Sequence, residues 1–161
     1  MKTINLLVIL AILWGISAFN FVDKKETRAK KQLEMAQLIE RGRFRFVARS
    51  AHSDLGEFNN LSPNYDMEFD SLNIKAYLPY YGRAYRAKYA DSNGGVKFNL
   101  TAQKIDIKYN ERKKIYTLNT DLKDVDESYT IFLSAGLDGF ADLRISFLNR
   151  QWISYYGTIE K

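Results

Sequence analysis

The stretch Tyr129–Phe147 reads YTIFLSAGLDGFADLRISF, and its pattern decides the fold. Apolar side chains recur at every second position on both sides of Asp138-Gly139, which is the period of a strand with one buried face. Asp-Gly between two such runs is a strong hairpin signal, because glycine accepts a positive φ at little cost. The stretch therefore predicts two antiparallel strands with one apolar face and one polar face.

The same period of two recurs along most of the chain after Gly42. Further strands are predicted at residues 44–48, 65–69, 74–78, 96–100, 105–109, 116–122 and 152–159. Residues 50–64 are polar and rich in turn formers, and are predicted as a loop. Consecutive strands with short connections predict an antiparallel β domain over residues 43–161, mainly β, in which a single sheet of about nine strands curls into an open barrel or a sandwich.

The composition removes several kinds of chemistry. The 161 residues include no cysteine, and His52 is the single histidine. Disulfides, thiolate catalysis, cysteine-ligated metals and multi-histidine zinc sites are therefore excluded. His52, Ser53 and Asp54 are adjacent in the predicted loop, and neighbours on one loop rarely reach the geometry of a catalytic triad. We expect no catalytic residue, no metal site and no cofactor.

The N-terminus has the layout of a signal peptide over residues 1–18. A lysine precedes an apolar run from Ile4 to Phe19, and small residues at Ser17 and Ala18 suit a peptidase. This predicts export, so that the protein is periplasmic or secreted. The alternative is an uncleaved membrane anchor, since extending the run to Val22 brings it close to spanning length. The cations that follow it favour the cytoplasm under the positive-inside rule, which argues against export.

Residues 19–42 are predicted as a charged helix in front of the sheet. Asp23–Arg41 contains neither proline nor glycine, and Gly42 follows as a stop signal. A stripe in its second half predicts that this end docks on the domain; it consists of Ala29, Leu33, Met35, Ala36, Leu38 and Ile39. Alternatively, the basic Lys24–Arg41 helix contacts the anionic headgroups of a membrane surface. Nucleic acid is not an expected partner, because no recognised reading motif is present.

The most unusual stretch is Tyr77–Tyr85, which reads YLPYYGRAY. A tyrosine ring offers an apolar body with a polar tip, and Arg83 can bind a carboxylate or phosphate through two hydrogen bonds. The candidate ligand-binding residues are Tyr80, Tyr81, Arg83, Tyr85, Tyr155 and Tyr156. They predict a non-enzymatic binding module for a small molecule, a glycan or an envelope protein. Alternatively the rings line the core or a strand crossing, and Pro79 and Gly82 shape the bend.

Two other functions remain open from the sequence. Exposed strand edges would suit a structural or assembly protein of the cell envelope. Asp66, Glu68 and Asp70 lie at a spacing of two and share one strand face, so Asp66 and Glu68 are the candidate pair for a hydrolase. A further acidic group, Asp121, Asp124, Asp126 and Glu127, could gather calcium but lacks the glycine and distal glutamate of a helix-loop-helix calcium loop. A solvated hairpin turn is the simpler interpretation of that group.

Three segments together resemble a known family. They are Tyr77–Tyr85, the NGGVKF turn at residues 93–98, and the ISYYG ending at residues 153–157. They look like the domain of unknown function 4251 family, and the resemblance covers roughly Lys24 to Ile159. It implies a small envelope protein of Gram-negative bacteria, with a signal peptide and a charged helix before a β-rich domain. It implies no activity and no catalytic residues.

Overall fold

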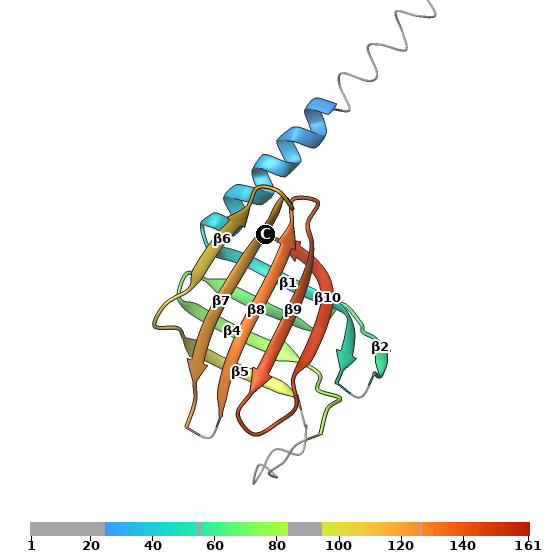
Figure 1. Cartoon of the computed structure of the whole chain (residues 1–161), viewed down its shortest axis with the longest axis vertical. Coiled ribbons are helices and arrows are strands. Elements are labelled where there is room, and N and C mark those ends of the chain that lie inside the picture. Colours follow the sequence, from blue (N-terminus) through green and yellow to red (C-terminus); the bar gives the residue numbers. More distant parts are fainter. Residues whose placement is uncertain (1–24, 55, 84–94, 126) are drawn as a thin grey trace, which may run out of the picture. The chain divides into compact units, whose positions relative to one another are not determined.

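The computed structural model describes residues 25–54, 56–83, 95–125 and 127–161. The described residues form ten strands in one antiparallel sheet (Figure 1). The strands are β1 (Arg43–Ser53), β2 (Phe58–Asn60), β3 (Asp66–Asp70), β4 (Asn73–Leu78), β5 (Val96–Thr101), β6 (Asp106–Asn110), β7 (Ile115–Lys123), β8 (Ser128–Gly136), β9 (Phe140–Phe147) and β10 (Ile153–Glu160). The prediction of a mainly β chain with a single antiparallel sheet is confirmed.

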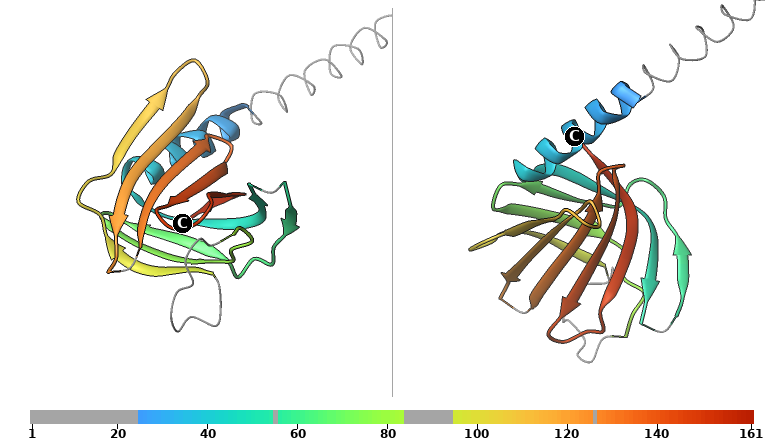
Figure 2. Two further views of the ribbon diagram at one scale, coloured as in Figure 1. Left: turned by 60° about the horizontal axis from the view of Figure 1, so that its bottom comes forward. Right: turned by 45° about the horizontal axis from the view of Figure 1, so that its top comes forward.

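The strand order is β5-β4-β3-β1-β10-β9-β8-β7-β6, with β2 paired to β1 outside this path. Figure 2 shows the sheet curling round so that β3, β4 and β5 face β7, β8 and β9 across its interior. The sheet is thus an open half-barrel, and β5 and β6 stand at the two ends of the path. The first and last strands of the domain, β1 and β10, lie side by side at its centre.

The core fills the inner face of this half-barrel. Burial alternates along the strands as the period of two requires: in β9, Leu143 and Ile145 are buried while Asp142 and Arg144 are exposed. The largest fully buried side chains include Phe46, Met67, Ile131, Leu133, Leu143 and Tyr155. Gly157 lies where β10 crosses β1, and a Cβ there would meet the carbonyl oxygen of Val47. A side chain at this position would push the two central strands apart.

A helix covers residues 25–40 and ends at Gly42, whose φ of 62° is the left-handed conformation of a helix stop. The chain divides into two compact units, Met1–Glu34 and Met35–Lys161. Within the second unit, Ile39 is buried in the core, and the Tyr116 hydroxyl donates a 2.6 Å hydrogen bond to Glu40 Oε1. The docking of this end of the helix and its stop at Gly42 are as expected.

The expected signal segment, residues 1–18, and the first residues of the charged helix lie outside the described residues. Among the residues that are described, no helix has the length and apolar character needed to cross a membrane.

The prediction of a loop over residues 50–64 is wrong. β1 continues to Ser53, and β2 pairs with it, so that His52 lies opposite Phe58 on a strand. The pairing of β1 with β10 shifts between Ala48 and Ser50, so that Arg49 and Ser50 both lie on the outer side, with Ser50 opposite Tyr156 and buried there. This bulge breaks the period of two and buries a polar residue, so the pattern no longer predicts a strand.

Candidate functional site

Hydrogen bonds join the segment after β4 to the start of β10 and to the segment before it. The Tyr155 hydroxyl donates a 2.6 Å hydrogen bond to the carbonyl oxygen of Pro79. The Tyr80 hydroxyl lies 2.9 Å from the carbonyl oxygen of Gln151 and 3.0 Å from that of Arg83. Gln151 also accepts the Arg83 N–H on its side-chain oxygen and donates its own N–H to the Arg83 carbonyl oxygen, each at 3.1 Å. The backbone of residues 79–83 is therefore fixed in place.

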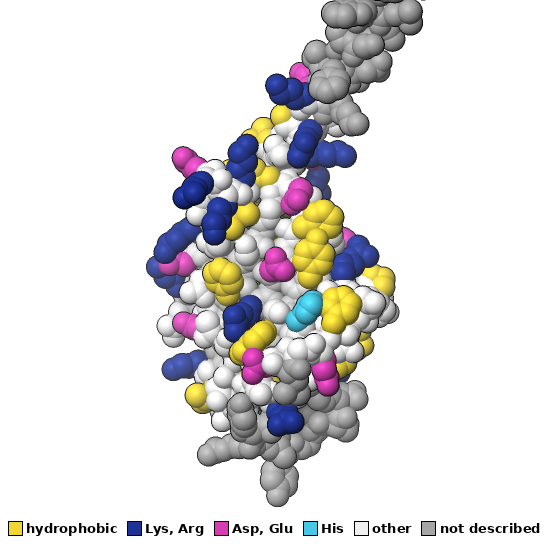
Figure 3. Space-filling model, turned by 45° about the vertical axis from the view of Figure 1, so that its right-hand side comes forward, with side chains coloured by type: hydrophobic (Ala, Val, Ile, Leu, Met, Phe, Trp, Pro, Cys, Tyr) yellow, Lys and Arg dark blue, Asp and Glu magenta, His cyan; other side chains and the backbone are white. Residues whose placement is uncertain are grey.

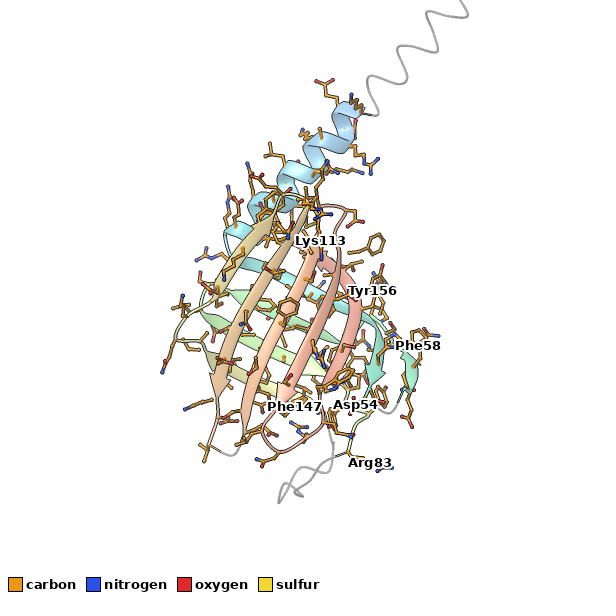
Figure 4. All side chains as sticks on the ribbon, viewed as in Figure 1. Asp54, Phe58, Arg83, Lys113, Phe147 and Tyr156 are labelled. Atoms are coloured by element: carbon orange, nitrogen blue, oxygen red, sulfur yellow. The ribbon has the colours of Figure 1, made fainter. Side chains whose placement is uncertain are left out.

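A buried ion pair lies beside these hydrogen bonds. Arg150 Nε is 2.9 Å from Glu127 Oε2, and the two side chains are only 11% and 3% exposed. The Arg150 guanidinium faces the rings of Phe147 and Tyr80, at 4.4 Å and 4.9 Å from their centroids. We call Tyr80, Glu127, Phe147, Arg150 and Tyr155 the basal cluster. Figure 4 places Phe147 and Arg83 at the same end of the sheet.

Two buried tyrosines at this end, Tyr155 and Tyr129, have raised pKa values. Burial raises the pKa of Tyr155 far above its ordinary value, and the nearby Arg150 charge opposes this only in part. Burial likewise raises the pKa of Tyr129, whose ring lies 5.8 Å from that of Phe147. Both phenols therefore stay protonated near neutral pH.

The acidic turn differs from its predicted form. Glu127 was expected in a solvated turn, but it is buried because Arg150 neutralises it, and Glu127 Oε1 also accepts the Asn149 N–H at 3.3 Å. Asp121 accepts a hydrogen bond from the Thr130 hydroxyl, and Asp126 lies outside the described residues. Within the described ranges, no group of three acidic or histidine side chains is placed to hold a metal ion.

The six predicted ligand residues do not form one surface. Tyr155 and Tyr156 are neighbours in β10, so their side chains point to opposite faces: Tyr155 is 1% exposed and Tyr156 is 41% exposed. Tyr80 also belongs to the basal cluster, whereas Tyr81 and Arg83 are exposed at its rim. Tyr85 lies outside the described residues. Figure 4 shows Tyr156 well away from Arg83 on the ribbon.

A second set of aromatic side chains lies on the outer face of the sheet. The rings of Phe140 and Tyr156 are parallel within 9°, with centroids 5.9 Å apart, and both are well exposed. Arg144 lies over the ring of Trp152, 4.0 Å from its centroid. The outer aromatic face, as we call it, consists of His52, Phe58, Phe132, Phe140, Asp142, Arg144, Trp152, Ser154 and Tyr156. Figure 3 shows this side, with hydrophobic side chains (yellow) around the single histidine (cyan).

The strand register lines up part of this face in one row. Phe132 on β8 lies opposite Arg144 on β9, which lies opposite Ser154 on β10. Ser154 in turn lies opposite His52 on β1, which lies opposite Phe58 on β2. Residues directly opposite one another project from the same side of a sheet, so the row crosses five strands. The 4.7 Å contact between the His52 and Phe58 rings closes its end.

Sequence reasoning included Tyr156 of this face and missed the remainder. Phe132 and Phe140 occupy outward positions of their strands, out of phase with the buried residues, and this was the available signal. Their gathering depends on the register of separate strands and on β2, which was not predicted. A phenylalanine at an outward position of a predicted strand is therefore the sequence feature that indicates an aromatic surface of this kind.

The outer face of β1, β3 and β4 is charged instead. Asp66, Glu68 and Asp70 do share one face of β3, each beside a cation from a neighbouring strand. The ion pairs are Arg43–Asp70 (3.0 Å), Arg45–Asp66 (3.8 Å) and Lys75–Glu68 (3.8 Å). Burial, with the Glu68 charge, raises the pKa of Asp66, while Arg45 and Lys75 oppose the rise. The three carboxylates of this face are therefore each paired with a cation of the same face. A hydrolase built on Asp66 and Glu68 stays a prediction.

These features define a small antiparallel half-barrel with the basal cluster at one end and exposed aromatic rings on its outer face. Residues 26–159 match the family model described as domain of unknown function DUF4251, and the chain belongs to that family. It is similar to the crystal structure of a DUF4251 family protein from Bacteroides eggerthii, with a TM-score of 0.62 and 17% identity. The match covers 82% of this chain and 88% of that one. No curated protein matches the sequence.

Proposed function

We propose that the protein is an exported, non-enzymatic binding module of the cell envelope that contacts its ligand through the outer aromatic face. The observation that carries this proposal is the exposure of Phe58, Phe132, Phe140 and Tyr156, which are 41–55% exposed on one side of the sheet. Exposed apolar groups gathered in this way mark interaction sites on soluble proteins. Aromatic and arginine side chains also dominate the energetics of binding surfaces.

The rings are presented by strands rather than by loops. Phe132, Phe140 and Tyr156 lie within β8, β9 and β10, whose backbones are paired on both sides. A ring with two torsions on a fixed strand loses little freedom when a ligand binds. The outer aromatic face is therefore organised before binding, which favours recognition.

Export is supported by the sequence of residues 1–18, with its lysine, apolar run and small residues. The non-enzymatic assignment is supported by three groups of the basal cluster: Glu127 and Arg150 neutralise one another, and burial keeps Tyr155 protonated. Tyr81 and Arg83 stay a predicted additional contact, since both are exposed beside that cluster. Membrane contact through the Lys24–Arg41 helix also stays a prediction.

The alternative is assembly with another envelope protein through a strand edge. The edge strand β6 carries Asp106 and Lys108, and Lys104 precedes it, with Asp106 within 3.1 Å and 3.8 Å of the two lysines. Charged side chains on an edge discourage the addition of another strand. The outer aromatic face is therefore the better-supported contact surface.

Site-specific photo-cross-linking in intact cells tests the proposal. The full chain carries p-benzoylphenylalanine in place of Phe132, on the outer aromatic face, or in place of Lys75, on the ion-paired part of the outer surface. We expect adducts at position 132 and none at position 75, as measured by mass spectrometry of the purified protein. Equal adducts at both positions, or none at 132, contradict the proposal.

Two further readouts come from the same samples. A third position, Tyr109 on β6, reports on the edge, and adducts there without any at 132 favour the assembly alternative. The mass of the purified chain reports on export: a chain that begins at Phe19 supports the signal peptide, whereas an intact Met1 supports the anchor.

A further inference from the structure

We infer that the ligand of the outer aromatic face is an uncharged oligosaccharide that lies across the strands, from Phe132 toward Phe58. This inference rests on the proposed function and names the ligand class for that same surface. It is carried by three features of the face: its length, the alternation of rings with polar groups, and its balance of charge.

The row has the dimensions of an extended chain of sugars. Phe132 and Phe58 are joined through Arg144, Ser154 and His52, each opposite the next on a neighbouring strand. Four strand spacings of about 4.8 Å give a row of roughly 19 Å. A surface of this length suits several linked sugar rings better than one small molecule, and its two aromatic ends suit stacking at both ends of the chain.

The rings are placed as stacking surfaces. Phe140 and Tyr156 have nearly parallel planes with centroids 5.9 Å apart, which is the geometry of an offset stack. Each is exposed by about half, 49% and 41%, which leaves one side open. The C–H face of a pyranose is flat and weakly positive, so it packs against the negative face of an aromatic ring.

Polar side chains lie between the rings at positions where sugar hydroxyls would need partners. Asp142 lies directly opposite Tyr156, and Arg144 lies directly opposite Ser154. Carboxylate, guanidinium and hydroxyl groups together both donate and accept hydrogen bonds, as a sugar hydroxyl does. The core of a protein–protein interface is instead depleted of aspartate and serine, which this face carries at positions 142 and 154. This alternation favours a glycan over a protein partner.

The charge of the face favours an uncharged glycan. Asp142 and Arg144 are two residues apart on β9 and project from the same side, so their opposite charges offset one another. Among the described residues, no carboxylate lies within ion-pair distance of Arg144, which is held instead over Trp152. An acidic glycan would meet one cation and one anion here and would gain little net attraction.

Saccharide binding by the full chain tests the inference. In a Trp14→Phe background Trp152, on the outer aromatic face, is the only tryptophan, so its fluorescence reports binding there. The probes are cellohexaose, maltohexaose and chitohexaose, all uncharged, and hexagalacturonate, which is anionic. We expect at least one uncharged probe to change the Trp152 emission saturably, with an affinity that changes less than about twofold between low and high salt.

The variants Phe140→Ala and Tyr156→Ala should each lower that affinity by about tenfold. Phe132→Ala is the second test, because Phe132 is one end of the row and its removal keeps the Phe140–Tyr156 pair. Tyr77→Ala, an exposed tyrosine on the charged part of the outer surface, is the matched control and should leave the affinity unchanged.

The inference is overturned if no uncharged probe binds, if only hexagalacturonate binds, or if these variants bind as the parent does. Its failure is distinct from failure of the proposed function. Protein or lipid adducts at position 132, together with no saccharide binding, overturn the inference and leave the binding module standing. The absence of every adduct at position 132 contradicts the binding module itself.

Discussion

Among the described residues, two arginine side chains lie over aromatic rings, one in the basal cluster and one on the outer aromatic face. Arg150 lies 4.4 Å from the Phe147 ring centroid and is buried against Glu127. Arg144 lies 4.0 Å from that of Trp152 and is exposed. The ring contact is alike in both, but only Arg150 has its charge neutralised and its donors occupied by protein groups. The comparison shows that the surroundings of the contact decide whether it stabilises the fold or leaves groups for a ligand.

The adjacent tyrosines of β10 repeat this contrast within one strand. Tyr155 points inward and uses its hydroxyl on the Pro79 carbonyl oxygen, whereas Tyr156 points outward and contacts the ring of Phe140. We therefore expect changes in the basal cluster to lower stability, and changes on the outer aromatic face to lower binding.

The largest effect is expected from Glu127→Gln. Removal of this carboxylate leaves the Arg150 charge buried without a counter-charge, which costs about 3–5 kcal/mol in comparable cases. Urea unfolding should show this loss, while saccharide or cross-linking signals of the folded fraction stay unchanged. The matched control is Asp70→Asn, which breaks an ion pair that is about 70% exposed and should cost less than about 1 kcal/mol. Equal losses in the two variants would remove the distinction between the regions.

Tyr155→Phe should have the next largest effect. It removes a 2.6 Å hydrogen bond and leaves the Pro79 carbonyl without this donor, at a cost of about 1–3 kcal/mol. Tyr156→Phe removes the hydroxyl of the exposed neighbour and should change the free energy of unfolding by less than about 0.5 kcal/mol. Chemical denaturation of both variants measures the difference, and a larger loss for Tyr156→Phe would contradict it.

The stability of the protein at high pH tests a third buried tyrosine, Tyr116, which lies outside the basal cluster. Burial, and then the hydrogen bond to Glu40 and its negative charge, raise the pKa of Tyr116 to about 12, above the ordinary value of 10.0. The neutral phenol is therefore favoured in the folded state. Its stabilising contribution is complete below pH 10 and is lost as the pH rises toward 12.

Between pH 9 and pH 11 Tyr116 should account for a loss of about 1 kcal/mol in the free energy of unfolding. Tyr116→Phe should flatten the dependence of stability on pH by that amount, as followed by urea unfolding at each pH. Tyr156→Phe, at an exposed tyrosine, is the control and should leave the dependence as it is. An unchanged slope in Tyr116→Phe would show that its hydroxyl ionises normally.

Tyr156→Ala should lower the free energy of unfolding less than Glu127→Gln or Tyr155→Phe does. Cross-strand aromatic pairs contribute roughly 0.2–1 kcal/mol, so loss of the contact with Phe140 should cost about that much. Thermal and urea unfolding measure it alongside the binding assay. A loss of several kcal/mol would show that the Tyr156 ring stabilises the fold as the basal cluster does. It would then argue against a role of this ring in binding.

Much of the fold follows from local patterns in the sequence. The period of two identified the strands of the meander, and the helix ends before Gly42 because glycine adopts the positive φ of 62°. Each strand that the sequence predicted keeps one face in the core and one in water. Its apolar and polar residues therefore alternate, and this pattern identifies the strand without reference to the rest of the chain. The bulge after Ala48 hides the end of β1 because it places two successive residues, Arg49 and Ser50, on the outer side and so interrupts the period of two, and β2 has only three residues to show a pattern.

The candidate site was predictable only in part, because it depends on contacts between distant segments. The Glu127–Arg150 pair joins two connections that are 23 residues apart, and only the strand order brings them together. The outer aromatic face needs the register of β8, β9, β10, β1 and β2 at once. The alternation that separates Tyr155 from Tyr156 was available from the sequence and argues against one surface containing both.

The pairing of β1 with β10 also governs when the domain can form during biosynthesis. The hydrogen bond between Arg45 and Glu160 joins residues 115 positions apart, at the centre of the sheet. Until β10 emerges, β1 to β5 and β6 to β9 are two separate groups of strands with unsatisfied edges. A nascent chain therefore stays incompletely folded until β10 is available, with exposed strands that a chaperone can hold. Loss of β10 would divide the domain rather than shorten it.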